Sequence, residues 1–113
     1  MDLIAKLCAL PVHFKSRRDV SVDQLVGESG YHVDPEALSV EAVSAHLREH
    51  PELVEVWLAY SEDKRTSSGW YIVPGPGDTF EVAFYPEGER LSMKGRVHAC
   101  AEFIVREVRS IAG

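Results

Sequence analysis

In the second half of the chain, hydrophobic and polar residues alternate with a period of two, which is the pattern of β-strands. Two segments, 79–85 and 90–94, show this alternation, and a third, 69–73, is rich in the aromatic and β-branched residues typical of strands. They are separated by two runs of turn-forming residues, Pro74-Gly75-Pro76-Gly77-Asp78 and Pro86-Glu87-Gly88-Glu89. The pattern predicts a three-stranded antiparallel β-meander. Because proline has no backbone N–H, we expect the first strand to end before Pro74.

One face of this predicted sheet is apolar. Pairing Val73 with Thr79 and Tyr85 with Arg90 sends seven large side chains to the same side, because successive residues of a strand point to opposite faces. These residues are Trp70, Ile72, Phe80, Val82, Phe84, Leu91 and Met93. The opposite face then carries Tyr71, Val73, Glu81, Ala83, Tyr85, Arg90 and Ser92. Since a hairpin alone is marginal in water, we expect a helix to cover the apolar face.

The rest of the chain has apolar residues at steps of three and four, which predicts helices. The clearest helix is 96–112, and earlier ones are predicted over 2–10, 21–26, 40–49 and from Pro51 onward. Ser39 and Pro51 suit the first turns of the last two. This order predicts an α+β fold in a single domain, residues 1–113. The N-terminal helices would either cover the polar face of the sheet or leave it exposed, and the pattern leaves both arrangements open.

Composition narrows the class of protein. The chain has 113 residues, 45% of them hydrophobic, and a formal net charge of −6 at pH 7. Such a charge argues against non-specific binding of nucleic acid and is compatible with a basic protein partner. The sequence has neither a bilayer-spanning apolar run nor the pattern of a secretion signal at its start. We therefore expect a cytoplasmic protein that does not bind membranes.

Candidates for catalysis or metal binding are few. His46 and His50 stand four residues apart, but no third ligand accompanies them, so we interpret them as surface residues at a helix end. Cys8 and Cys100 lie in apolar helical patterns and are expected to be buried, reduced thiols, with a disulfide between them as the alternative. We predict no catalytic residues, no metal site and no cofactor.

Two groups of residues are candidates for a partner-binding surface. Tyr60, Glu62 and Asp63 lie near the end of a predicted helix, and Tyr71, Glu81 and Tyr85 lie on the polar face of the sheet. Exposed aromatic residues are common anchors at protein interfaces. The alternative for the first group is a solvated helix end with local ion pairs. The alternative for the second is a sheet face covered by helices.

Three stretches resemble small bacterial proteins: Trp57-Leu58-Ala59-Tyr60-Ser61-Glu62-Asp63-Lys64-Arg65, Ser68-Gly69-Trp70-Tyr71 and Ala99-Cys100-Ala101-Glu102-Phe103-Ile104. In its general design the chain is similar to immunity proteins encoded beside polymorphic or contact-dependent toxins, which are short, acidic, cytoplasmic α+β proteins without catalytic residues. The resemblance implies neutralisation of a toxin by occlusion. It assigns no role to an individual residue.

Three functions are compatible with these features. The leading hypothesis is a non-enzymatic protein-binding domain, in the form of an immunity protein that binds a basic toxin domain through the six candidate residues. The second is a small ligand-binding domain or enzyme that uses the polar 60–71 region, which a pocket lined by Tyr60, Lys64, Arg65 and Trp70 would favour. The third is a structural or regulatory homodimer formed through the outer sheet face.

Overall fold

The structure has an α+β fold in which a three-stranded antiparallel sheet packs on the C-terminal helix. It is a computed structural model that describes residues 3–12, 22–31, 34–64, 69–86 and 88–112. The elements are α1 (Leu3–Cys8), α3 (Val22–Glu28), the 3-10 helix η1 (Pro35–Ala37), α4 (Val40–Glu49), α5 (Glu52–Lys64), β1 (Gly69–Pro74), β2 (Thr79–Tyr85), β3 (Arg90–Lys94) and α6 (Arg96–Ala112). The strand order β1-β2-β3 confirms the predicted meander.

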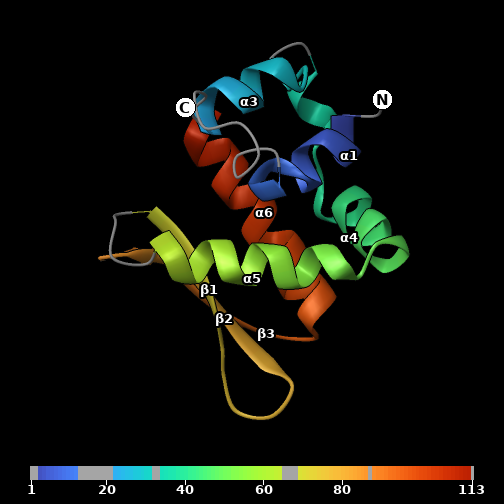
Figure 1. Cartoon of the computed structure of the whole chain (residues 1–113). Helices are drawn as coiled ribbons and strands as arrows, with labels where there is room; N and C mark the ends of the chain where they lie inside the picture. Colours follow the sequence, from blue (N-terminus) through green and yellow to red (C-terminus); the bar gives the residue numbers. More distant parts are fainter. Residues whose placement is uncertain (1–2, 13–21, 32–33, 65–68, 87, 113) are drawn as a thin grey trace.

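Helix α6 organises the molecule. It runs through the middle, with α1 and α3 toward one end and the sheet toward the other (Figure 1). α6 packs against all three strands, and α5 packs against both β1 and α6. α1 packs against α4, and α3 packs against α6. Among the described elements, therefore, neither α1 nor α3 packs on the sheet.

The core forms where the apolar stripe of α6 meets the other elements. Cys100, Ile104 and Val108 of the predicted stripe are fully buried. Phe103 packs edge-on against Trp57 of α5, with ring centroids 5.9 Å apart. The Trp57 indole N–H donates a 2.7 Å hydrogen bond to the Cys8 carbonyl, which ties α5 to the N-terminal helix. Burial of these large side chains is the main stabilising contribution expected for a domain of this size.

The faces of the sheet are as predicted, but the predicted pairing was wrong by two residues in both hairpins. Val73 pairs with Glu81 rather than Thr79, and Arg90 pairs with Ala83 rather than Tyr85. Because a shift of two residues keeps each side chain on its face, the apolar and polar faces are unchanged. Trp70 and Phe84, for example, are paired and lie on the same face, with ring centroids 5.6 Å apart.

In the first hairpin, the two-residue shift in pairing follows from the position at which the loop between β1 and β2 closes. β1 continues through Pro74, one residue beyond the predicted end. The loop then closes through a 2.9 Å hydrogen bond from the Gly75 N–H to the Thr79 carbonyl. Gly77 adopts φ +62°, a left-handed conformation that glycine adopts readily. Pro74 is tolerated because it lies on an edge strand, where a missing N–H need not break the ladder.

The helices agree with prediction except near the N-terminus. The Ser39 side chain accepts a 3.1 Å hydrogen bond from the Ala42 N–H, which confirms the predicted cap of α4. α1 ends at Cys8, earlier than the predicted residue 10, and residues 10–12 form a further helical turn. α5 begins at Glu52, one residue after Pro51. Asp2 and Ser21, at which the predicted helices 2–10 and 21–26 begin, lie outside the described part of the chain.

Candidate functional site

The outer face of the sheet, the side of Tyr71, Glu81 and Arg90, carries a polar network centred on Glu81. The Tyr71 hydroxyl donates a 3.2 Å hydrogen bond to Glu81 Oε2, and Arg90 Nη1 lies 3.7 Å from Glu81 Oε1. Both partners are diagonal cross-strand neighbours of Glu81. Partial burial, followed by the hydrogen bond to Glu81, raises the pKa of Tyr71. Because Arg90 balances the charge of Glu81, the centre of this face is polar rather than acidic.

No described helix covers the outer face. α6 packs against the apolar face, and α5 lies along the β1 edge. Tyr85 is 45% exposed there, and Val73 is half-buried. Ala83 is buried between Tyr71 and Arg90, its larger neighbours in the register. An exposed tyrosine beside a hydrogen-bonded polar network has the composition of a protein interface.

A groove with a volume of about 480 Å³ lies between α5 and β1. Its lining residues are Glu55, Leu58, Ala59, Glu62, Ile72, Val73 and Pro74. Five of these seven residues are apolar, whereas Glu55 and Glu62 are exposed carboxylates of α5. We call this feature the α5–β1 groove. It offers an apolar contact area flanked by negative charge.

Ser61 fixes the two elements that form the groove. Its hydroxyl accepts a 2.8 Å hydrogen bond from the Ile72 N–H and donates a 3.0 Å hydrogen bond to the Ile72 carbonyl. Ser61 is fully buried, so these bonds are shielded from water. Nothing in the sequence pattern indicated that Ser61 would bond to a strand backbone.

The six predicted site residues divide into two sets. Glu62 lines the α5–β1 groove, and Tyr71, Glu81 and Tyr85 lie on the outer face. Val73 joins the two areas because it lines the groove and pairs with Glu81. The side chain of Asp63 lies outside the described residues.

Tyr60 lies elsewhere, in the contact between α5 and α6. Its hydroxyl donates a 2.6 Å hydrogen bond to Oε2 of Glu107, which is only 2% exposed. Burial, and then the charge of Glu107, raise the pKa of Tyr60 strongly. The sequence analysis did not identify Glu107. Its position next to Val108, on the apolar side of the helix, could have indicated a buried hydrogen-bond donor, because a buried carboxylate needs one.

No protein-family model matches the chain, and no curated protein or solved structure is significantly similar to it. Function is therefore inferred from the geometry of the chain itself. Within the described residues, no helix combines the length and the apolar character needed to cross a membrane.

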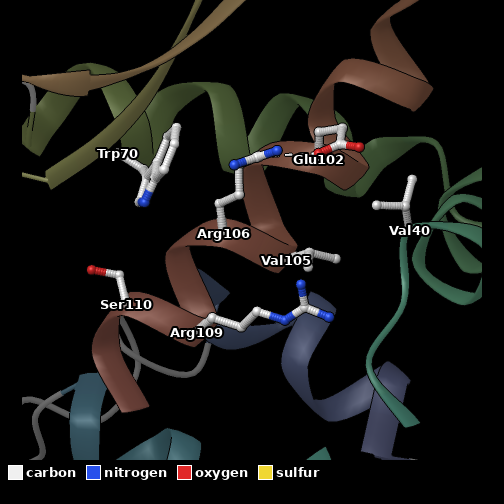
Figure 2. A pocket seen from close by; sticks show the side chains of 7 residues that line it. All are labelled: Val40, Trp70, Glu102, Val105, Arg106, Arg109 and Ser110. Carbon is white, nitrogen blue, oxygen red and sulfur yellow. Dashed lines mark hydrogen bonds and ion pairs between the residues drawn. The ribbon is translucent and has the colours of Figure 1, made fainter. Parts of the chain in front are cut away.

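A second hollow, with a volume of about 430 Å³, lies beside α6 (Figure 2). Its lining residues are Val40, Trp70, Glu102, Val105, Arg106, Arg109 and Ser110. Arg106 lies between Trp70 and Glu102 (Figure 2), with its guanidinium carbon 5.0 Å from the Trp70 ring centroid. Arg106 Nε donates to Glu102 Oε2 and Nη1 to Glu89 Oε1, each at 3.1 Å.

Arg106 therefore links α6 to β1 and to the second turn. Two carboxylates and an aromatic face already satisfy its guanidinium, which leaves it poorly suited to hold a separate ligand. Trp70 belongs to this hollow, but Tyr60 is not among its lining residues. The side chains of Lys64 and Arg65, the other two residues of the predicted pocket, lie outside the described residues.

The histidines and cysteines complete the candidates for chemistry. The His46 and His50 rings are 4.5 Å apart, and His50 Nδ1 is 3.8 Å from Glu52 Oε2. In the described part of the chain, no group of three or more His, Cys, Asp or Glu residues is arranged to hold a metal ion. Cys8 and Cys100 are buried free thiols, which confirms their predicted burial. Burial first, and then the proximity of Cys8, raise the pKa of Cys100 to about 12.

Proposed function

We propose that the protein is a non-enzymatic protein-binding domain whose partner docks on the α5–β1 groove and the adjoining outer face of the sheet. The observation that carries this proposal is the groove itself, in which five apolar residues are flanked by the exposed Glu55 and Glu62. Val73 extends the groove onto the face that carries Tyr71 and Tyr85. We call the combined area the α5–sheet surface.

The composition of the α5–sheet surface supports a protein partner. Interface centres are enriched in aromatic and apolar residues, and their rims are polar. Leu58 and Val73 supply half-buried apolar area, and Tyr85 supplies an exposed aromatic ring. The Tyr71–Glu81 hydrogen bond holds a polar rim in a defined geometry before a partner arrives, which lowers the entropic cost of binding.

Charge supports a basic partner. Glu52, Glu55 and Glu62 are exposed and repeat at helical steps along α5. Glu55 is also paired with Arg96 of α6, so Glu52 and Glu62 contribute most to the local negative field. The whole chain carries a formal charge of −6. Such a field speeds the approach of a basic protein and makes its association dependent on salt.

An immunity protein that occludes a basic toxin domain is the form of this function that we favour. The size and acidic charge of the chain suit that role, as does its resemblance in design to such proteins. Occlusion requires a surface that binds and covers the toxin and requires no catalytic group in the inhibitor. The natural candidate partner is the product of the neighbouring reading frame, if it encodes a secreted toxin.

The test is to purify that product and to measure its affinity by calorimetry and its association rate by stopped-flow fluorescence. We expect Glu62→Lys to slow association about tenfold at low salt and Tyr85→Ala to weaken binding by at least about fivefold. Glu41→Lys is the matched control because Glu41 is an exposed glutamate on a different helix, α4, and it should leave binding unchanged. The proposal would be contradicted if both substitutions, Glu62→Lys and Tyr85→Ala, left binding unchanged. It would also be contradicted if the candidate partner did not bind at all. A homodimer lost on Tyr85→Ala, detected by light scattering, would replace it with the homodimer hypothesis.

A further inference from the structure

The two outer edges of the sheet differ in whether another strand can add to them. The Gly75 N–H donates to the Thr79 carbonyl, and bonding alternates along an antiparallel strand, so Ile72 and Pro74 direct their backbone groups away from β2. Ser61 already bonds both backbone groups of Ile72, and Pro74 has no N–H. The β1 edge is therefore blocked to strand addition along Ile72 and Pro74.

The β3 edge has the opposite character. The Phe84 N–H donates to the Glu89 carbonyl at 3.0 Å, which sets the alternation along β3. Arg90, Ser92 and Lys94 consequently direct their N–H and C=O groups away from β2. Among the described residues, no side chain or loop backbone bonds to these outward groups. A row of such groups is a template for strand pairing.

Side-chain charge selects which strand fits this edge. The side chains of Arg90, Ser92 and Lys94 are exposed on the outer face. In an antiparallel dimer centred on Ser92, Arg90 of each copy would face Lys94 of the other, and directly opposed like charges are destabilising. An added strand with acidic residues opposite Arg90 and Lys94 would instead be attracted to β3. On the inner face Leu91 and Met93 are half-buried, so apolar residues opposite them would extend the apolar face.

We propose that β3 is a docking edge for an extended peptide segment of a partner protein with the pattern acidic-apolar-polar-apolar-acidic. The segment adds as a fourth strand next to β3, with its acidic residues opposite Arg90 and Lys94. This edge lies across the sheet from the α5–β1 groove. The inference therefore goes beyond the proposed function and does not depend on it.

The test uses the full chain and the capped peptide acetyl-Gly-Glu-Val-Thr-Val-Glu-Gly-amide, followed by amide NMR and hydrogen exchange. We expect a Kd of about 1 mM or tighter. Binding should protect the amides of Arg90, Ser92 and Lys94 while leaving Ile72 unchanged. The matched peptide with lysine in place of both glutamates should bind at least about fivefold more weakly. Lys94→Glu leaves one positive and one negative side chain on β3, so it should abolish this preference between the two peptides.

A pair of substitutions at Ser92 separates backbone pairing from side-chain contact. Ser92→Pro removes an outward N–H without removing a bond to β2, so it should abolish peptide binding, whereas Ser92→Ala should retain it. The proposal is overturned if the two peptides bind equally, if Lys94→Glu has no effect, or if the protected amides lie outside β3. Self-association through β3 without peptide would also overturn it. If Ser92→Pro does not fold, Lys94→Glu still decides the outcome.

Discussion

Tyr60 and Glu107 form a 2.6 Å hydrogen bond that joins α5 to α6 across 47 positions of sequence. Glu107 is nearly inaccessible to water, and a buried carboxylate is costly without donors. The Tyr60 ring also packs edge-on against Trp57, at a centroid distance of 5.3 Å. Tyr60, which the sequence suggested as an interface residue, therefore stabilises the helical core.

Replacing Tyr60 tests this role. We expect Tyr60→Phe to lower the free energy of unfolding by about 1–3 kcal/mol, because it removes a donor from a buried carboxylate. Urea denaturation measures the change. The matched control is Tyr71→Phe, which removes the same atom from a more exposed tyrosine–glutamate pair and should cost about 0.5 kcal/mol or less. Equal losses in the two variants would contradict the structural role of Tyr60.

The bonds of Ser61 to Ile72 predict a second effect on stability. Ser61→Ala leaves a strand N–H and C=O without a partner in a buried contact, so we expect a loss of about 1–3 kcal/mol. In the same variant, hydrogen exchange at the Ile72 amide should become faster, because that amide has lost its hydrogen-bond acceptor. Ser110→Ala, at an exposed serine of α6, provides a control that should change stability by no more than about 0.5 kcal/mol. An unchanged Ile72 exchange rate would show that the bond is not formed.

Arg106 gives a third prediction. Lysine retains the positive charge but cannot donate to two carboxylates in a planar fork or stack flat on Trp70. We therefore expect Arg106→Lys to lower the free energy of unfolding by about 1–2 kcal/mol. Arg109→Lys is the control in thermal or urea unfolding, because Arg109 makes one 3.3 Å bond to the Leu38 carbonyl and is more exposed. If Arg109→Lys lowered the free energy of unfolding as much as Arg106→Lys, the contacts of Arg106 would have no special role in stability.

Cys100 predicts a dependence of stability on pH. Its pKa is raised to about 12 in the folded chain, from the ordinary thiol value of 9.0 that we expect in the unfolded chain. The folded state binds more protons between these values, so the unfolding free energy should fall as pH rises, by up to about 1.4 kcal/mol per pH unit. Tyr60, whose pKa is also raised, adds a loss in the same direction at higher pH.

Urea unfolding between pH 8 and pH 10 measures this slope. Cys100→Ala removes the thiol and should flatten the slope relative to the unmodified chain. Thiol accessibility provides an independent check, because a buried protonated thiol should react slowly with a thiol reagent until the chain unfolds. Rapid modification of both cysteines in the folded chain would contradict their burial.

Local pattern was enough to predict the strands, α6 and the two faces of the sheet. Side chains alternate strictly along a strand, so the composition of 69–73 and 79–85 determined which residues share a face. The same pattern did not determine the pairing. Val73 opposite Thr79 and Val73 opposite Glu81 preserve the same faces, and the choice depended on where the loop after Pro74 closed.

What the sequence determined by itself was therefore periodic: the elements, the buried stripe of α6 and the separation of apolar from polar positions. The tertiary structure decided which residues meet across long separations. It turned Tyr60 inward to Glu107, brought Ser61 to the edge of β1 and left the outer edge of β3 without a strand partner among the described residues. A period of two in strands, or of three to four in helices, determines the direction in which a side chain points from its own element. The contacts of Tyr60, Ser61 and β3 depend instead on how separate elements are placed against each other.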